Sequence, residues 1–295
     1  MEPWAKPPGV LRLGRRTFSA DDRLVMAVVN RTPDSFSDAG LTFEESAALA
    51  AVDRAVAEGA DIVDVGGVKA GAGDPVDVAE ECRRVVPIVE AVRARHPDVV
   101  ISVDTWRHEV GRAAAQAGAD LLNDAWAGYD PELAEVAAEY DLGLVCSHTG
   151  GTAPRTVLMH PEYDDVVAAV LDGLATLVDR ALALGVRADG LLIDPAHDFG
   201  KTTWHSLEVT RRIDELVATG WPVLVAVSRK DFVGETLDRP VGQRLAGTLA
   251  VTAWCAAAGA RVFRAHDVRA TRDVVDMVSA IQGLRPPARV VRGLE

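Results

Sequence analysis

Four polar residues stand at the ends of short apolar runs and have side chains that suit ligand or metal binding. They are Asn30, Asp104, Asn123 and Asp194. Carboxylate and amide oxygens bind hard cations, and the same groups pair with the donors and acceptors of a heterocycle. Because all four occupy the same place relative to their runs, we expect them to gather at one end of a parallel sheet.

Two later clusters add positive charge. Ser228-Arg229-Lys230 follows one apolar run, and Arg264 and His266 alternate onto a single face of the last. Arginine and histidine placed in this way favour phosphate or pyrophosphate. Acids and amides on one arc, with cations on the other, predict a pocket for a polar heterocycle that carries a phosphorylated arm.

Eight strand-like runs must position these groups, and their starts advance by roughly 34 residues, the length of a strand, a helix and two loops. Ala-rich stretches with helical spacing, such as residues 44–52 and 131–138, lie between them. This alternation predicts an α/β fold, a (β/α)₈ TIM barrel with its active site at the carboxyl ends of the strands. A doubly wound open sheet is the rival fold, but it would not need eight near-equal units. The predicted strands are Leu24 to Asn30, Asp61 to Gly67, Val99 to Thr105, Asp120 to Ala125, Gly143 to Thr149, Gly190 to Pro195, Pro222 to Ser228 and Ala260 to Asp267.

Composition indicates one large domain, since the chain has 295 residues, is 48% hydrophobic and has no linker-like stretch. We expect an N-terminal tail and capping hairpin over 1–23, the barrel over 24–285 and a C-terminal tail over 286–295. The hairpin is expected at Val10 to Phe18, where polar and apolar residues alternate around Gly14. Residues 1–9 are expected to fray.

Charge and composition also restrict function and location. The formal net charge of -13 disfavours nucleic acid as a partner. No run of eighteen apolar residues and no signal-peptide core is present, so we expect a cytoplasmic protein without membrane contact. The three cysteines, Cys82, Cys146 and Cys255, have no CxxC spacing and are interpreted as small buried hydrophobes.

Taken together, the strand-end clusters resemble the successive signatures of the dihydropteroate synthase family, in the right order and over about residues 24 to 285. The resemblance implies the pterin-binding TIM barrel. It rests on residues 30–38, Ile62-Val63-Asp64-Val65-Gly66-Gly67, Ile101-Ser102-Val103-Asp104-Thr105, Asn123-Asp124, Ile193-Asp194-Pro195, Phe199-Gly200-Lys201, Ser228-Arg229-Lys230 and Arg264-Ala265-His266-Asp267.

The resemblance implies a reaction of folate biosynthesis, in which the amine of p-aminobenzoate displaces pyrophosphate from a hydroxymethyl-dihydropterin diphosphate, with Mg²⁺ on the pyrophosphate. It implies that Asp104, Asn123, Asp194 and Lys230 bind the pterin, that Asn30 holds the metal with Arg264 and His266 at the pyrophosphate, that Ser228 and Arg229 lie toward the aminobenzoate, and that Lys230, Asp104 and Arg264 are catalytic. Family members are usually homodimers, and the apolar run Leu245 to Ala258 would suit such a contact or a buried helix equally well.

One departure from the family affects the phosphate side. After Gly66-Gly67 the family has Glu-Ser-Thr-Arg-Pro-Gly, whereas this chain has Val68-Lys69-Ala70-Gly71-Ala72-Gly73. Loss of one charge-assisted phosphate contact costs about 1.5 to 3 kcal/mol. We hypothesise that Arg31 or Lys69 supplies a compensating cation.

Two further departures alter other walls of the pocket. Ala196-His197-Asp198-Phe199 replaces the usual Gly-Phe-Gly-Phe, so an apolar wall near the aminobenzoate becomes polar. His148-Thr149-Gly150-Gly151 replaces His-Met-Gln-Gly. We interpret His148 and His197 as loop hydrogen-bonders. In these respects the chain resembles the actinobacterial second-copy type of dihydropteroate synthase homologue.

Three functional interpretations follow. The first is a paralogue that binds a pterin or another phosphoester and has weak or no synthase activity. The second is a working synthase whose other cations replace the missing contacts. The third is a methyltetrahydrofolate-dependent methyltransferase on the same barrel, although Arg264-Ala265-His266-Asp267 and Ser228-Arg229-Lys230 follow the synthase pattern.

Overall fold

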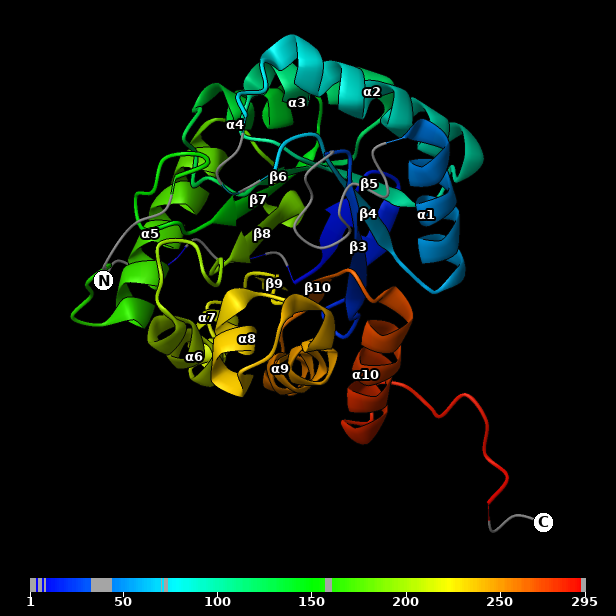
Figure 1. Ribbon diagram of the computed structural model, residues 1–295, viewed down its shortest axis with the longest axis vertical. Coiled ribbons are helices and arrows are strands. Elements are labelled where there is room, and N and C mark those ends of the chain that lie inside the picture. The colour runs from blue at the N-terminus through cyan, green and yellow to red at the C-terminus, as the bar shows by residue number, and fades with distance from the viewer. Residues whose placement is uncertain are drawn as a thin grey trace.

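Eight parallel strands form a barrel with helices around it (Figure 1), as the computed structural model shows for residues 4, 7, 9–32, 44–69, 71, 74–156 and 161–292. The hydrogen-bonded order is β8-β7-β6-β5-β4-β3-β10-β9, and a bridge between Ile193 and Val223 brings β8 to β9. The predicted TIM barrel is therefore confirmed, and each strand lies within its predicted run. The strands are β3 (Leu24–Asn30), β4 (Ile62–Gly66), β5 (Val100–Asp104), β6 (Leu121–Asp124), β7 (Gly143–Ser147), β8 (Leu191–Asp194), β9 (Leu224–Val225) and β10 (Val262–Ala265).

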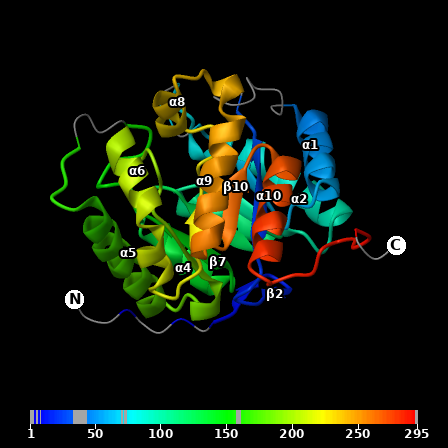
Figure 2. The same ribbon diagram turned by 90° about the horizontal axis from the view of Figure 1, so that it is seen from below.

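Helices follow the strands and cover the outside of the barrel, as Figures 1 and 2 show from two directions. Their starts are fixed locally: the side chain of Asp77 caps α2, that of Asp165 caps α5, and Thr202 and His205 form a capping box on α6. The helices are α1 (Glu45–Ala57), α2 (Val78–Arg95), α3 (His108–Ala117), α4 (Glu132–Glu139), α5 (Val166–Ala183), α6 (Thr203–Arg211), α7 (Ile213–Val217), α8 (Asp231–Leu237), α9 (Leu245–Ala258) and α10 (Val268–Ile281).

The predicted hairpin is present as β1 (Leu11–Leu13) and β2 (Arg16–Phe18), an antiparallel pair. Leu11 and Leu13 are fully buried and pack with residues near the start of the barrel strands, such as Leu24 and Ile62. The hairpin therefore closes the bottom of the barrel, which leaves the opposite end as the mouth. Residues 1–3, 5, 6 and 8 of the expected tail lie outside the described residues, and the division into 1–23, 24–285 and 286–295 stays a prediction.

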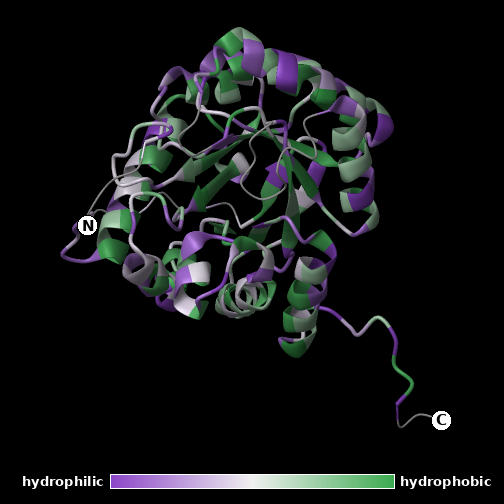
Figure 3. Ribbon diagram, in the orientation of Figure 1, coloured by the Kyte–Doolittle hydropathy of each residue, from purple (hydrophilic) through white to green (hydrophobic). Residues whose placement is uncertain are grey.

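Side chains alternate between the barrel interior and the helix layer because the strand repeat is two residues. Met26, Ile62, Val100 and Leu121 fill the lower interior, whereas neighbours such as Val63 and Ile101 pack under the helices. Figure 3 shows the strands as mainly hydrophobic and much of the outer helix surface as hydrophilic. The apolar interior layer forms the floor on which the polar residues of the mouth stand.

Within the described residues, no helix is both long enough and apolar enough to cross a membrane.

Candidate active site at the barrel mouth

A polar layer begins two residues above the apolar floor. Asp64, Ser102 and Asn123 lie on β4, β5 and β6, each on the inward face that Ile62, Val100 and Leu121 define. Ser102 Oγ donates to Asp64 Oδ1 over 2.6 Å, and Asn123 Nδ2 donates to Asp64 Oδ2 over 3.2 Å. Asp64 is fully buried, so its charge needs these donors.

Arg264 of β10 joins this layer to the mouth. Its Nε donates to Asp64 Oδ2 over 2.7 Å, and its Nη2 donates to Asp104 Oδ2 over 2.9 Å. Burial raises the pKa of Asp104 to about 7, and neighbouring acids including Asp64 add to the effect while Arg264 opposes it. Arg264 is partly buried, which lowers the pKa of its guanidinium, yet the two carboxylates raise that pKa above its usual value. Two acids therefore share one cation, and protonation of Asp104 would leave that cation less fully compensated.

A cavity of about 310 Å³ opens above this network. Six of the nine sequence-predicted site residues line it: Asn30, Asp104, Ser228, Lys230, Arg264 and His266. The other lining residues are Val28, Thr32, Val68, Lys69, Gly71, Asp198, Phe199 and Asp231. The structure thus brings strand ends from both halves of the chain to one cavity.

Three predicted site residues do not line the cavity. Asn123 is 3% exposed and donates its amide to Asp64, and Asp194 is 6% exposed and accepts a hydrogen bond from the amide of Ala196. Arg229 turns to Asp267, with Nη2 2.8 Å from Oδ1. In this conformation these residues support the mouth from below or from the side.

Lys230 lies beside the ring of Phe199, which forms part of the cavity wall. Its Nζ donates to the carbonyl of His197 and lies 4.7 Å from the centre of the Phe199 ring. Burial lowers the pKa of Lys230, while Asp198 and Asp194 oppose the shift. Its ammonium is thus held to the loop that follows β8.

That loop has an unusual backbone and contains a buried lysine, Lys201. Ala196 and Asp198 both have positive φ, of 50° and 69°, at the two positions where the sequence comparison expects glycine. Lys201 Nζ lies 3.0 Å from His148 Nδ1 and also donates to the carbonyls of His148 and Phe199. Burial lowers the pKa of Lys201 to about 7 and that of His148 to about 3. Both groups hold the loops together.

The carboxylate of Asp198 is taken up by local donors. Its Oδ2 accepts from the amides of Asp231, over 2.7 Å, and Phe232, over 3.3 Å, and its Oδ1 accepts from Ser206 Oγ over 3.1 Å. Burial raises the pKa of Asp198, and Lys230 opposes the shift. The loop after β8 is therefore fastened to the start of α8 by an internal acid.

The altered loop after β4 lies beside the same cavity. Lys69 lines the cavity, whereas Arg31, the other cation proposed to compensate, is 8% exposed and its Nε donates to the carbonyl of Arg84 in α2. Arg155, from the loop after β7, donates to the carbonyl of Asp74 over 2.7 Å. Residues 33–43, 70, 72 and 73 lie outside the described residues, and so do most of residues 30–38, on which the family resemblance partly rests.

Sequence reasoning missed two residues that organise the site. Asp64 was visible as an acid inside the apolar run 61–67, in the same register as Ser102 of the next strand. Asp198 was seen only as a polar change in the loop, because its partners, the amides of Asp231 and Phe232, lie more than thirty positions away in the chain. Periodicity carries the first signal, but no local pattern carries the second.

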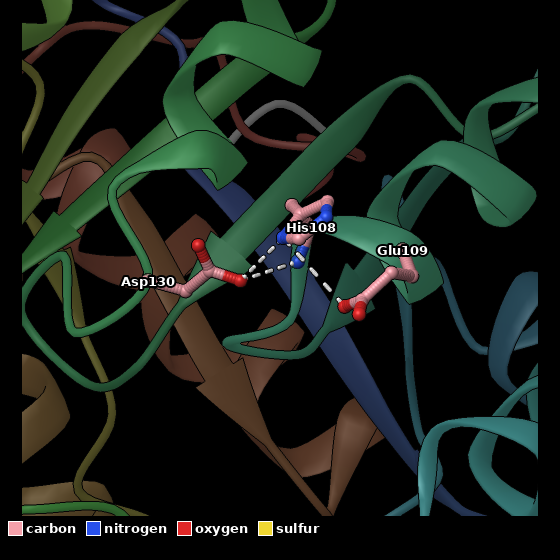
Figure 4. A group of neighbouring side chains, drawn as sticks. All are labelled: His108, Glu109 and Asp130. Carbon is pink, nitrogen blue, oxygen red and sulfur yellow. Dashed lines mark hydrogen bonds and ion pairs between the residues drawn. The ribbon is translucent and has the colours of Figure 1, made fainter.

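A separate group of residue types that can bind metal ions, His108, Glu109 and Asp130, lies where α3 and α4 begin (Figure 4). Asp130 Oδ2 accepts from both the amide and Nδ1 of His108, and its Oδ1 accepts from the amide of Glu132. These contacts cap the starts of α3 and α4, so the group has a structural explanation.

Residues 26–266 match the family of pterin binding enzymes. Over 283 residues the chain is 58% identical to a Mycobacterium leprae protein named inactive dihydropteroate synthase 2, covering 95% of this chain and 97% of that one. It is 39% identical to the dihydropteroate synthase of Haemophilus influenzae, covering 87% and 93%. The chain belongs to the dihydropteroate synthase family.

Solved dihydropteroate synthases have the same fold. The Yersinia pestis enzyme, solved with a sulfonamide drug complex, superposes with a TM-score of 0.88 at 34% identity, covering 94% of this chain and all of that one. The Xanthomonas albilineans enzyme, solved with 4-aminobenzoic acid, gives 0.84 at 38% identity, covering 93% and 98%. The match extends over the whole dihydropteroate synthase barrel, so the differences that matter are those at the mouth.

Proposed function

We propose that this chain is a dihydropteroate synthase paralogue that binds a pterin or another phosphoester in the barrel mouth and has weak or no condensation activity. The Mycobacterium leprae relative bears the name of an inactive synthase and is far more similar to this chain than the Haemophilus influenzae synthase is. The cavity with Asn30, Ser228 and His266 supports retention of a ligand site.

This proposal rests mainly on the few cations that are placed to stabilise a departing pyrophosphate. The loop after β4 brings Lys69 to the cavity but carries no arginine or threonine between Val68 and Gly73. Arg31 turns to α2, and Arg264 is shared by two acids. Leaving-group charge that is not stabilised raises the barrier, and each missing charge-assisted contact costs about tenfold or more in rate.

The competing interpretations have less support. A working synthase requires other cations at the mouth to replace the missing arginine, and of the two we considered only Lys69 lines the cavity. The relatives described above are named synthases or inactive synthases, which lends no support to a methyltransferase.

Magnesium forms part of the proposal. An amide oxygen from Asn30 suits Mg²⁺, which keeps several waters and takes its other ligands from substrate phosphates. Asn30 lines the cavity next to Asp104, since a Cβ on Gly66 would lie within 4 Å of both side chains. Asn30 would hold the ion, and the ion would neutralise phosphate charge.

We also propose a cytoplasmic homodimer. Residues Ala246, Ala250, Trp254 and Ala257 form an exposed stripe without charge along α9, and Trp254 is 57% exposed. Met277 and Ile281 extend the apolar surface on α10, which packs beside α9. Such a surface suits a second copy of the chain. The three cysteines are free, as expected in a reducing compartment.

The test of the function is to restore the family loop. A variant carrying Val68→Glu, Lys69→Ser, Ala70→Thr, Gly71→Arg and Ala72→Pro should form dihydropteroate from the diphosphate, Mg²⁺ and p-aminobenzoate at a rate at least tenfold above the wild type. The same substitutions with alanine in place of the new arginine serve as the matched control. Wild-type turnover equal to that of the restored variant, with the rate of a working synthase, would refute the proposal.

A further inference from the structure

One wall of the cavity presents acids that accept hydrogen bonds. Asp198 and Asp231 line this wall together with Phe199. Asp231 is 64% exposed in its side chain and pairs with Arg244 over 2.7 Å, whereas Asp198 is partly buried within the loop. A ligand that enters between the Phe199 ring and the start of α8 therefore meets two carboxylates.

The backbone amides on that wall already donate to a side chain of the protein. The amides of Asp231 and Phe232 both point to Asp198 Oδ2, and Ser206 Oγ points to Oδ1. The ammonium of Lys230 donates to the carbonyl of His197. Backbone amides and a lysine are the groups that would bind an anionic ligand end. Here an internal carboxylate accepts from both amides, and a carbonyl accepts from one of the three N–H groups of the lysine.

The backbone holds Asp198 in this position at a conformational cost. Its φ of 69° lies in the left-handed region, where a side chain is disfavoured unless local hydrogen bonds compensate. The three donors to its carboxylate provide that compensation. Glycine at this position would keep the turn but free both amides.

We propose that Asp198 is a specificity-determining residue that excludes a carboxylate from the wall beside Phe199 and selects a ligand end that donates hydrogen bonds, such as an amide or amine. This inference rests on the proposed function, because it concerns the part of the same cavity in which the p-aminobenzoate of that function would lie. A carboxylate offers acceptors only, so it would compete with Asp198 for the engaged amides and face a like charge. An amide of the same shape can donate to the acids instead.

Two aromatic ligands of matched shape test the idea: p-aminobenzoate and p-aminobenzamide. Each is titrated into the wild type with saturating pyrophosphate and Mg²⁺, with binding followed by ligand-observed NMR. We expect the amide to bind about tenfold more tightly than the carboxylate, the change that one unfavourable charge contact produces. Asp198→Asn should reduce this ratio below about threefold, and Asp198→Gly should reverse it.

Asp238→Asn is the matched control, because Asp238 also has positive φ, of 52°, and does not line the cavity. It should keep the wild-type ratio. Equal or tighter binding of the carboxylate by the wild type, an unchanged ratio in Asp198→Asn, or no binding of either ring would overturn the proposal. Pyrophosphate binding and dihydropteroate formation are measured separately in every variant, so failure of the proposed function would be recognised independently.

Discussion

Asp64 and Arg264 lie 200 positions apart in the sequence and form a 2.7 Å contact inside the barrel. The pair links the second and the last of the parallel strands, β4 and β10, at the level of the mouth. Asp64 also accepts from Ser102 and Asn123, so four strands meet at one carboxylate. Asp64 therefore both joins the barrel strands to one another and holds Arg264, a cavity residue, in place.

Asp64→Ala should lower the free energy of unfolding by about 3 to 5 kcal/mol, because it leaves Arg264 without one of its buried partners and leaves Ser102 and Asn123 unpaired. Urea denaturation measures the change. Asp273→Ala, which removes an exposed pair with Arg269 on α10, is the control and should cost less than about 1 kcal/mol. Similar small losses in both variants would show that the network is unimportant for stability.

Anion binding should depend on pH through Asp104. Its pKa of about 7 means that the carboxyl gains a proton as the pH falls from 8 to 6, which leaves Arg264 less compensated and strengthens anion binding. Sulfate is the appropriate probe because its own charge is constant over this range. Calorimetry should show tighter binding at pH 6 than at pH 8, and Asp104→Asn should remove the difference. A pH dependence that survives in the variant would assign it to another group.

The raised pKa of Asp104 also predicts the direction in which the stability of the protein changes with pH. An acid whose pKa is higher in the folded state binds more protons there, so the free energy of unfolding falls as the pH rises from about 4 to about 7. Between about pH 4 and pH 7, the free energy of unfolding of Asp104→Asn should change less with pH than that of the wild type.

Ala196→Gly should stabilise the protein by about 0.5 to 1 kcal/mol, since a φ of 50° is disfavoured for alanine and accessible to glycine. Thermal denaturation measures the effect. Ala256→Gly, in the interior of α9, is the opposite control and should destabilise by about 1 kcal/mol. A loss of stability in Ala196→Gly would mean that the loop gains more from the methyl group than it loses in strain.

Trp254→Glu should convert a dimer to a monomer in sedimentation experiments, because it places a charge in the apolar stripe of α9. Trp204→Glu is the matched control, since Trp204 is 80% exposed and lies on α6 rather than on α9. A monomeric wild type, or an unchanged dimer in Trp254→Glu, would contradict the proposed interface.

Strand positions were predictable because short apolar runs recur at a nearly constant spacing and end in polar residues. The run 24–30 matches β3 at both ends. The predicted strand 222–228 is longer than the observed β9, which spans only Leu224–Val225. At its start Pro222 has no amide to donate, and at its end the side chain of Ser228 contacts His266. The gathering of the polar residues at the strand ends was also predictable, since six of the predicted site residues line one cavity.

The remaining features depend on contacts that sequence spacing does not encode. Arg229 and Lys230 are neighbours, yet Arg229 pairs with Asp267 while Lys230 lines the cavity. Asp198 has a left-handed backbone conformation, and only the fold brings the amides of Asp231 and Phe232 to its carboxylate. Such pairings follow from tertiary geometry.

The most direct test of the central claim is calorimetric titration of the wild-type protein with hydroxymethyl-dihydropterin diphosphate and Mg²⁺, followed by p-aminobenzoate and an assay for dihydropteroate. A parallel titration with pyrophosphate and Mg²⁺ measures the phosphate side by itself. We expect that pyrophosphate or the diphosphate binds and that little or no dihydropteroate forms. Micromolar binding of the diphosphate followed by sustained dihydropteroate formation would contradict it and identify a working synthase.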